Sequence, residues 1–256
     1  HHQLQQDEET FTNLLPVSVA SLKLLVDEAR TKWADEPHRV DLVQRCGEKL
    51  ADVLIGKVDP LELVFSDSSF DEQEKLIQKV TLIRYYNAII KAVVQQIIHA
   101  LSPTANLKIL ELGGGMGMTT SCLLPILPPQ QTSYTFTDVG RLFLNRAQQK
   151  FSAYPFVQYR LLNIEQSPRE QEYDNHSFDV VIASNVLHVT RNIGETLGYI
   201  HSLLVPGGLF LNWEITQPQL DFDITDGLLM QPLADGKRNQ GNPFLSKEQW
   251  QEALQT

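Results

Sequence analysis

The sequence has few of the features that direct a protein to a membrane, an oxidising compartment, a metal ion or nucleic acid. No apolar run approaches the ~20 residues that a membrane-spanning helix needs. Only two of the 256 residues are cysteines, Cys46 and Cys122, and no CxxC or HxxxH spacing is present. We therefore expect reduced thiols, a cytoplasmic location and no bound metal. The net charge is −10 and Lys and Arg do not cluster, which disfavours nucleic acid as a partner.

Two hydrophobic periodicities divide the chain into a helical part and an α/β part. Over residues 14–100 apolar residues recur at helical spacing, most clearly along the stripe at 76–98. Beyond them, short apolar runs alternate with amphipathic stretches, as in parallel sheets with right-handed crossovers. This alternation predicts strands at 108–112, 133–138, 157–162, 178–184 and 208–214. We predict an α/β fold in which a helical subdomain at 1–104 precedes a Rossmann-like, mainly parallel sheet flanked by helices at 105–256.

A run of glycines follows the first predicted strand, in the segment Leu110–Gly117. Glycines between a strand and a helix let the backbone turn tightly and approach a ligand. Glu111 precedes Gly113 by two residues, with Gly115 further along the run. An acid there is unfavourable beside the pyrophosphate of NAD, but it is compatible with the zwitterionic methionine of S-adenosylmethionine (SAM). The segment therefore favours SAM over NAD or a plain turn.

Polar residues follow the next two predicted strands. Asp138 stands about 20 residues after the glycines, where an acid can accept both ribose hydroxyls of a nucleoside. The alternative is an ordinary helix cap or turn. After the third strand, Asn163 can hydrogen-bond the adenine edge while Ile164 packs on the ring. An ordinary exit from the strand explains these two residues equally well.

A histidine and a carboxylate end the last two predicted strands. His188 follows the fourth strand and Glu214 ends the fifth. Ligands of open α/β sheets bind beyond the carboxyl ends of the strands, so both residues are placed where an acceptor should lie. A carboxylate beside a histidine fixes its tautomer and raises its basicity, which predicts a general base. The alternative is a histidine that only caps or packs.

These segments resemble the class I SAM-dependent methyltransferases and, more narrowly, the methyltransferase domains of modular polyketide synthases. The resemblance covers about residues 80 to 254 and is carried by 109–115, 134–138, 178–190 and 203–214. It implies SAM as cofactor, S-adenosylhomocysteine as product and no metal. It also implies that Ser184 contacts the cofactor and that the His188–Glu214 dyad deprotonates the acceptor.

The resemblance extends to the parts of the chain around this core. The helical part resembles the N-terminal lid of the family, in which Tyr85 would cover SAM and Tyr86 would contact substrate. The alternative is that both are core aromatics at helical spacing. Asn185, Arg238 and Asn242 are expected to contact the substrate or its phosphopantetheine arm. The family's sheet usually has two further strands beyond the helix predicted at 247–254, so we expect the core to lack its last strands.

Two departures from the family pattern bear on the reaction. C-methylating members usually carry a longer lid and a Gly-Trp-Trp-like segment after the fifth strand, where this chain has Asp226–Met230. Both departures favour O-methylation of a β-hydroxyl on a polyketide tethered to an acyl carrier protein, with neighbouring synthase domains as partners. The alternative is C-methylation at the α-carbon of a β-ketoacyl thioester. A third interpretation is a non-catalytic scaffold domain of a synthase.

Overall fold

The structure of the protein, a computed structural model, divides into two compact units, His1–Asp67 and Ser68–Thr256. It describes residues 5–7, 10–12, 19–34, 37–65, 74, 77–217, 219–236, 238 and 242–255. The division falls after Asp67, whereas the sequence led us to expect it at residue 104.

The first unit is mainly helical. It contains the antiparallel strands β1 (Gln5–Asp7) and β2 (Thr10–Thr12), which the sequence did not predict, and the helices α1 (Val19–Lys32), α2 (Pro37–Leu54) and α3 (Pro60–Val64). Asp59 caps α3 by accepting a hydrogen bond from the Leu61 amide. Arg45 of α2 donates to the carbonyl oxygens of Leu63 and Val64, which joins α2 to α3.

The second unit is built on a sheet of five strands that all run parallel. They are β3 (Leu107–Leu112), β4 (Thr132–Asp138), β5 (Val157–Leu161), β6 (Phe178–Ser184) and β7 (Leu204–Trp213). Their order is β5-β4-β3-β6-β7, which confirms the predicted Rossmann-like fold. From β3 the chain passes to β4 and β5 on one side of β3, and later to β6 and β7 on the other side. The crevice beyond the carboxyl ends of β3 and β6 is therefore the topological switch point, where such sheets bind ligands.

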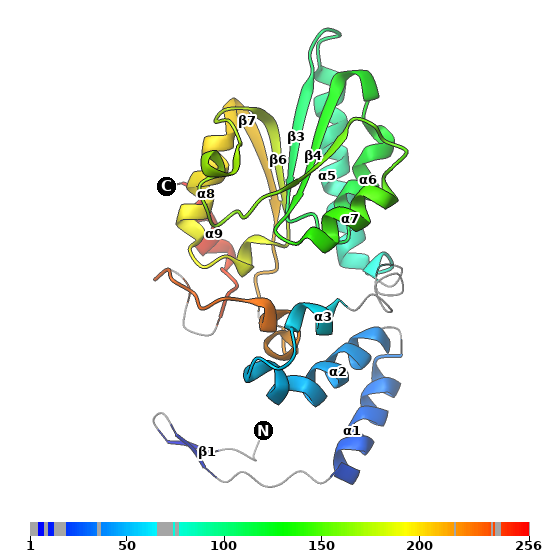
Figure 1. The fold of residues 1–256 in the computed structure, drawn as a ribbon, viewed down its shortest axis with the longest axis vertical. Helices are drawn as coiled ribbons and strands as arrows, with labels where there is room; N and C mark the ends of the chain where they lie inside the picture. The colour runs from blue at the N-terminus through cyan, green and yellow to red at the C-terminus, as the bar shows by residue number, and fades with distance from the viewer. Residues whose placement is uncertain are drawn as a thin grey trace. The chain divides into compact units, whose positions relative to one another are not determined.

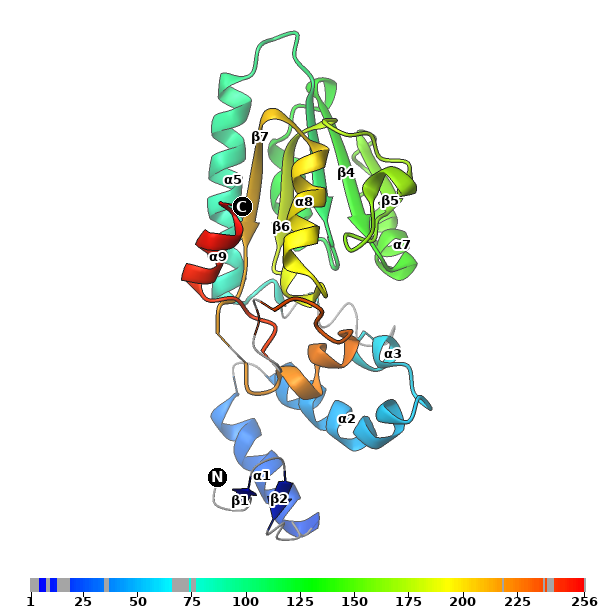
Figure 2. The same ribbon diagram turned by 90° about the vertical axis from the view of Figure 1, so that its left-hand side faces the viewer.

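Helices cover both faces of this sheet (Figure 1, Figure 2). One face carries α5 (Thr81–Ala100), α6 (Met118–Leu123) and α7 (Arg141–Lys150), and the other carries α8 (Ile193–Leu203) and α9 (Lys247–Ala253). Val94 of α5 shares a buried cluster with Ile109 of β3. Leu110, the next residue along β3, belongs to a second cluster with Ile200 of α8 and Trp250 of α9. Successive residues of a strand point to opposite faces, which explains the two clusters.

The placement of α5 accounts for the shifted boundary between the units. Its apolar stripe was assigned to the N-terminal subdomain because it follows other helical segments without a break in periodicity. In the structure, Ile90 and Val94 bury this stripe in the core of the sheet. Helical periodicity identifies a buried face but not the element that covers it, so it predicts the helix and leaves its packing partner open.

Three further features concern the part of the chain that the structure describes. None of its helices is both long and apolar enough to cross a membrane. No group of three or more His, Cys, Asp or Glu residues in this part is arranged to hold a metal ion. Cys46 is buried, Cys122 is half-buried, and no disulfide joins them.

Candidate active site

The glycine loop after β3 adopts a conformation that side chains rarely tolerate. Gly113, Gly115 and Gly117 have φ values of +56°, +51° and +71°. A Cβ on Gly113 would lie 2.3 Å from Val186 Cγ2, and one on Gly114 would lie 2.2 Å from the Phe136 ring. A Cβ on Gly115 would meet only the Gly113 carbonyl oxygen, at 3.9 Å. The loop is therefore closed toward the protein and open beside Gly115, as a cradle for a small ligand should be.

Asp138 ties this loop to the end of β4. Its Oδ2 accepts a hydrogen bond from the Gly115 amide at 3.0 Å, and its Oδ1 accepts one from the Gly140 amide at 2.8 Å. Burial raises the pKa of the Asp138 carboxyl, although these amides oppose the shift. Each oxygen retains a lone pair that can accept a ribose hydroxyl, so the geometry fits the nucleoside predicted from the sequence.

Glu111 lies beneath the loop, with only 1% of its surface exposed. Its Oε2 accepts hydrogen bonds from the hydroxyls of Thr120 and Tyr134, the latter at 2.7 Å. Burial raises the pKa of Glu111 to about 7 against the opposing effect of these hydrogen bonds. Sequence reasoning missed both hydroxyl partners, because they come from α6 and β4 and no local pattern links them to Glu111. Contact between Glu111 and the methionine of SAM stays a prediction.

The loop after β5 is held rigidly at the same edge of the sheet. Gln171 accepts from the Asn163 amide at 2.8 Å and donates to the Asn163 carbonyl oxygen at 2.9 Å. The Asn163 side chain accepts from the Glu165 amide at 3.0 Å. Ile164 is partly buried against the cluster that contains Leu162. The predicted adenine contacts of Asn163 and Ile164 are compatible with this arrangement but are not tested by it.

The predicted dyad is present at the ends of β6 and β7. His188 Nδ1 lies 2.8 Å from Glu214 Oε2. Glu214 Oε1 accepts from the Val186 amide at 2.8 Å and the Leu187 amide at 2.6 Å, so one carboxylate holds both the turn and the ring. A carboxylate can only accept from Nδ1 when that nitrogen carries the proton, which leaves Nε2 as the basic nitrogen. This is the tautomer that a general base needs, and the role of His188 as that base stays a prediction.

Aromatic rings surround the histidine. The ring of His188 lies with its centroid 5.8 Å from that of Phe222 and 5.1 Å from that of Phe244. Only 7% of the His188 surface is exposed, and no described residue supplies a hydrogen-bond partner for Nε2. The Asn242 side chain accepts from the Phe244 amide at 3.0 Å, which fixes the turn that carries this aromatic ring. A substrate contact by Asn242 stays a prediction.

Two other predicted contacts also have structural partners. Thr119 Oγ1 lies 2.9 Å from both Ser184 Oγ and Asn87 Oδ1, which links the end of β6 to α6 and α5. Asn185 adopts a φ of +54°, and its Oδ1 accepts from the Ile215 amide at 3.2 Å. Both residues therefore brace the edge of the sheet, and their predicted ligand contacts stay predictions.

The two tyrosines of α5 differ in their surroundings. Tyr86 stacks on Trp213, with ring centroids 5.3 Å apart and planes 6° from parallel. Both rings are only partly buried, and no local sequence pattern links the two residues. The predicted substrate contact of Tyr86 stays a prediction. Tyr85 is 61% exposed and touches Tyr86 edge-on, so its predicted role over the cofactor stays a prediction.

Arg238 is a predicted substrate contact whose side chain lies inside the protein. Its guanidinium is buried and donates to the carbonyl oxygens of His188 and Thr190 and to the Asp235 carboxylate. These donors contact groups of the protein, and Asp235, three residues earlier, pairs with the guanidinium. A substrate contact by Arg238 stays a prediction.

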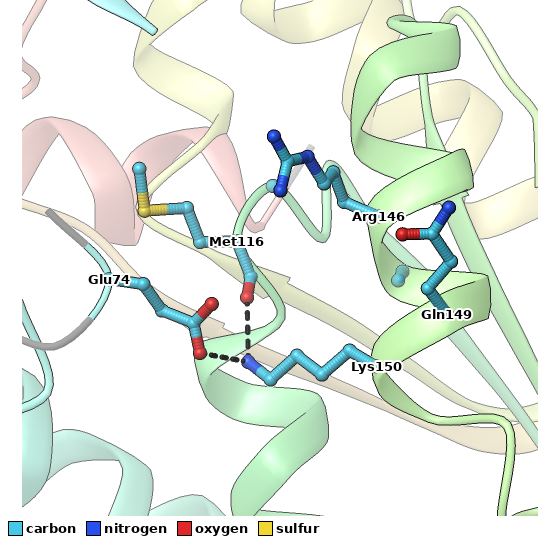
Figure 3. Close-up of a pocket in the computed structure, with 7 residues that line it drawn as sticks. Glu74, Met116, Arg146, Gln149 and Lys150 are labelled. Carbon is cyan, nitrogen blue, oxygen red and sulfur yellow. Dashed lines mark hydrogen bonds and ion pairs between the residues drawn. The ribbon is translucent and has the colours of Figure 1, made fainter. Parts of the chain in front are cut away.

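A pocket of about 360 Å³ adjoins the outer side of the glycine loop (Figure 3). It is lined by Glu74, Gly115, Met116, Arg146, Ala147, Gln149 and Lys150. Lys150 Nζ donates to the Met116 carbonyl oxygen at 3.0 Å and pairs with Glu74 at 2.7 Å. The pocket does not include Asp138 or His188, and its lysine supports the loop at Met116.

Comparison with known proteins places this site in a family. Residues 110–210 match the family model of a methyltransferase domain. Tenellin synthetase of Beauveria bassiana (strain ARSEF 2860) is 33% identical over 100% of the chain, which spans 6% of that protein. The non-reducing polyketide synthase adrD of Penicillium roqueforti is 35% identical over 84% of the chain, which spans 9% of that protein.

Solved structures resemble the chain over a much larger share of their length. The CurJ carbon methyltransferase has a TM-score of 0.89 and 33% identity, covering 99% of this chain and 68% of its own. The CMeT domain of the citrinin polyketide synthase has a TM-score of 0.80 and 28% identity, covering 99% and 67%. The trans-methyltransferase CalH, in complex with SAH, has a TM-score of 0.74 and 30% identity, covering 94% and 67%.

Proposed function

Because the chain belongs to the SAM-dependent methyltransferases of the polyketide-synthase type, we propose that it methylates the α-carbon of a β-ketoacyl thioester. The acceptor would be tethered by phosphopantetheine to an acyl carrier protein, with neighbouring synthase domains as further partners. Support comes from the CurJ enzyme, which is a carbon methyltransferase. O-methylation, which the sequence favoured, is less well supported. The short lid is only weak evidence for O-methylation, because the chain spans only 68% of the CurJ structure.

The observation that carries the proposal is the position of the dyad relative to the glycine loop. Val186 packs so closely on Gly113 that a Cβ there would lie 2.3 Å from its Cγ2. The same turn carries His188 two residues later, with Nδ1 on Glu214 at 2.8 Å. The base and the cofactor loop therefore share one edge of the sheet, at its topological switch point.

The residues of the chain support removal of a proton from carbon. When bound, SAM supplies an electrophilic methyl group that a carbanion can attack. His188 Nε2 takes a proton from the α-carbon, which is acidified by the ketone and the thioester on either side. Glu214 accepts the Nδ1 hydrogen bond and stabilises the imidazolium that forms. Asp138 and the glycine loop hold the nucleoside in place, so the reactants meet in a fixed orientation.

The same base could serve a hydroxyl acceptor, and the two reactions are separated by paired substrates. We would incubate the protein with SAM and either a β-ketoacyl or a β-hydroxyacyl carrier protein of equal chain length. Mass spectrometry should show one added methyl group on the β-ketoacyl chain alone, and fragmentation should place it on the α-carbon. Methyl transfer to the β-hydroxyacyl chain alone would establish O-methylation instead. No transfer to either chain, together with no SAM binding by calorimetry, would support the scaffold alternative.

A further inference from the structure

Arg238 and Asp235 form an ion pair inside the protein, directly behind the turn that carries His188. The guanidinium Nη2 lies 2.5 Å from Asp235 Oδ2, and the two side chains are only 1% and 7% exposed. The Arg238 Nε atom donates to the same carboxylate at 3.0 Å. Burial opposes ionisation of Asp235, but hydrogen bonds from Arg238 and Ile193 hold its pKa below the usual value. The pair is therefore a charged and well-satisfied one.

The guanidinium contacts the main chain at two points of the turn. Nη1 donates to the His188 carbonyl oxygen at 3.0 Å, and Nη2 donates to the Thr190 carbonyl oxygen at 2.5 Å. Asp235 Oδ2 also accepts from the Ile193 amide at 2.9 Å, at the start of α8. The rigid fork of an arginine can satisfy several acceptors at once, which a lysine cannot do.

Two opposite charges thus hold successive parts of the same turn, the amides at its start and the carbonyl oxygens nearer its end. The Glu214 carboxylate accepts the amides of Val186 and Leu187 and the Nδ1 atom of His188. The Arg238 guanidinium donates to the carbonyl oxygens that follow. The turn also has hydrogen bonds of its own, from the Val189 amide to the Val186 carbonyl oxygen and from the Thr190 amide to the Leu187 carbonyl oxygen. The two side chains add contacts at both ends of the backbone from which the imidazole projects.

The energetics favour a geometric explanation of the pair. Removing two charges from water costs several kcal/mol per ion, and buried pairs are often no more stabilising than apolar residues of the same volume. The donor set of Arg238 is directed at the backbone of the base and at Asp235, which in turn holds the guanidinium. Stability alone therefore does not explain why a charged fork is placed here.

We propose that Arg238 and Asp235 are positioning residues that hold His188 in register with the acceptor. The inference rests on the proposed function, because it takes His188 as the base. A misplacement of about 1 Å in a catalytic group can cost about 10²-fold in rate. Loss of the guanidinium should therefore reduce turnover without weakening the binding of SAM, whose loop follows a different strand.

The experiment compares Arg238→Met, Arg238→Lys and Asp235→Asn with the wild type. A matched control is Arg30→Met, which removes the exposed Arg30–Asp41 ion pair of α1 and α2. For each protein we would measure kcat and KM for methyl transfer to the acyl-carrier substrate, and the Kd for SAM by calorimetry. Hydrogen exchange of the amides at 186–193 would report the order of the turn without any substrate.

Arg238→Met should lower kcat by about 10- to 100-fold while KM and the SAM Kd change less than about twofold. In this variant the amides at 186–193 should exchange faster than in the wild type. Arg238→Lys and Asp235→Asn should give kcat values and exchange rates between those of Arg238→Met and the wild type. The control Arg30→Met should match the wild type in both measurements. If Arg238→Met does not bind SAM because it is unfolded, the same measurements on Arg238→Lys and Asp235→Asn test the proposal. Unchanged kcat and unchanged exchange at 186–193 in folded variants would overturn the proposal. Failure of the proposed function would appear differently, as a wild type that does not methylate the β-ketoacyl chain.

Discussion

The protonation of the buried Glu111 carboxyl makes the free energy of unfolding depend on pH. Its pKa is raised to about 7 because burial disfavours the charged form, whereas the unfolded chain titrates near 4.5. Between these values the folded protein keeps a proton that the unfolded protein has lost. The stability that this group contributes is therefore complete below pH 4.5 and disappears as the pH rises through 7.

Glu111→Gln should flatten this pH dependence, since glutamine keeps an acceptor for Thr120 and Tyr134 and does not ionise. Relative to wild type, the variant should gain on the order of 3 kcal/mol of unfolding free energy between pH 5 and pH 8. Urea denaturation at both pH values measures the difference, with exposed Glu170→Gln as the control. An equal difference between variant and wild type at the two pH values would show that Glu111 titrates normally.

His188 and Glu214 are expected to fail in distinguishable ways. His188→Ala removes the base, so methyl transfer should slow by about 10²- to 10⁴-fold while the Kd for SAM stays unchanged. Glu214→Gln presents an amide N–H to Nδ1, which favours the tautomer with Nε2 protonated and should slow transfer comparably. Single-turnover rates at saturating SAM measure both effects, with exposed His99→Ala as the control. A His188→Ala protein that transfers methyl at the wild-type rate would rule out the base.

The glycine loop contains one glycine that packs against the core and one that we expect to face the ligand. Gly114→Ala places a Cβ 2.2 Å from the Phe136 ring, so it should overpack the core and destabilise by about 1–3 kcal/mol. Gly115→Ala faces open space at a φ of +51°, so it should cost about 1–2 kcal/mol in strain and fill the cradle. We expect SAM affinity to fall most in Gly115→Ala.

Calorimetry for SAM and thermal denaturation together check this division of roles. Gly198→Ala is the matched control, because a Cβ in this position of α8 meets nothing within 4 Å. It should leave SAM binding intact and stabilise by about 0.5–1 kcal/mol. Normal SAM affinity in Gly115→Ala would show that the ligand does not lie against this part of the loop.

Elements whose pattern is local could be predicted from the sequence. The five strands are predictable because each is a short apolar run. The dyad is predictable because Glu214 directly follows β7 and His188 lies in the turn just beyond β6. The Arg238 contacts could not be predicted, since its carbonyl partners lie 50 and 48 residues away. The stacking of Tyr86 on Trp213 likewise joins distant elements. Sequence periodicity reports which face is buried, whereas such pairings depend on the assembled fold.

At the scale of the whole molecule, S-adenosylhomocysteine should stabilise the unit that contains the site. The glycine loop, Asp138 and the dyad all belong to the unit Ser68–Thr256, so a ligand bound there stabilises the folded state of that unit. S-adenosylhomocysteine at 100 times its Kd should add about 2.7 kcal/mol, which raises Tm by several degrees. Differential scanning fluorimetry over a ligand series measures the shift, and Gly115→Ala should reduce it. A Tm that does not respond to the ligand would contradict binding at this site.

The most direct measurement follows deuterium at the α-carbon of a β-ketoacyl carrier protein in D₂O, with no SAM present. After subtraction of the spontaneous rate, the wild-type protein should accelerate exchange at this carbon, and His188→Ala should not. Acceleration that persists in His188→Ala, or no acceleration by a wild type that still transfers methyl from SAM, would contradict the assignment of His188 as the base that generates the carbanion.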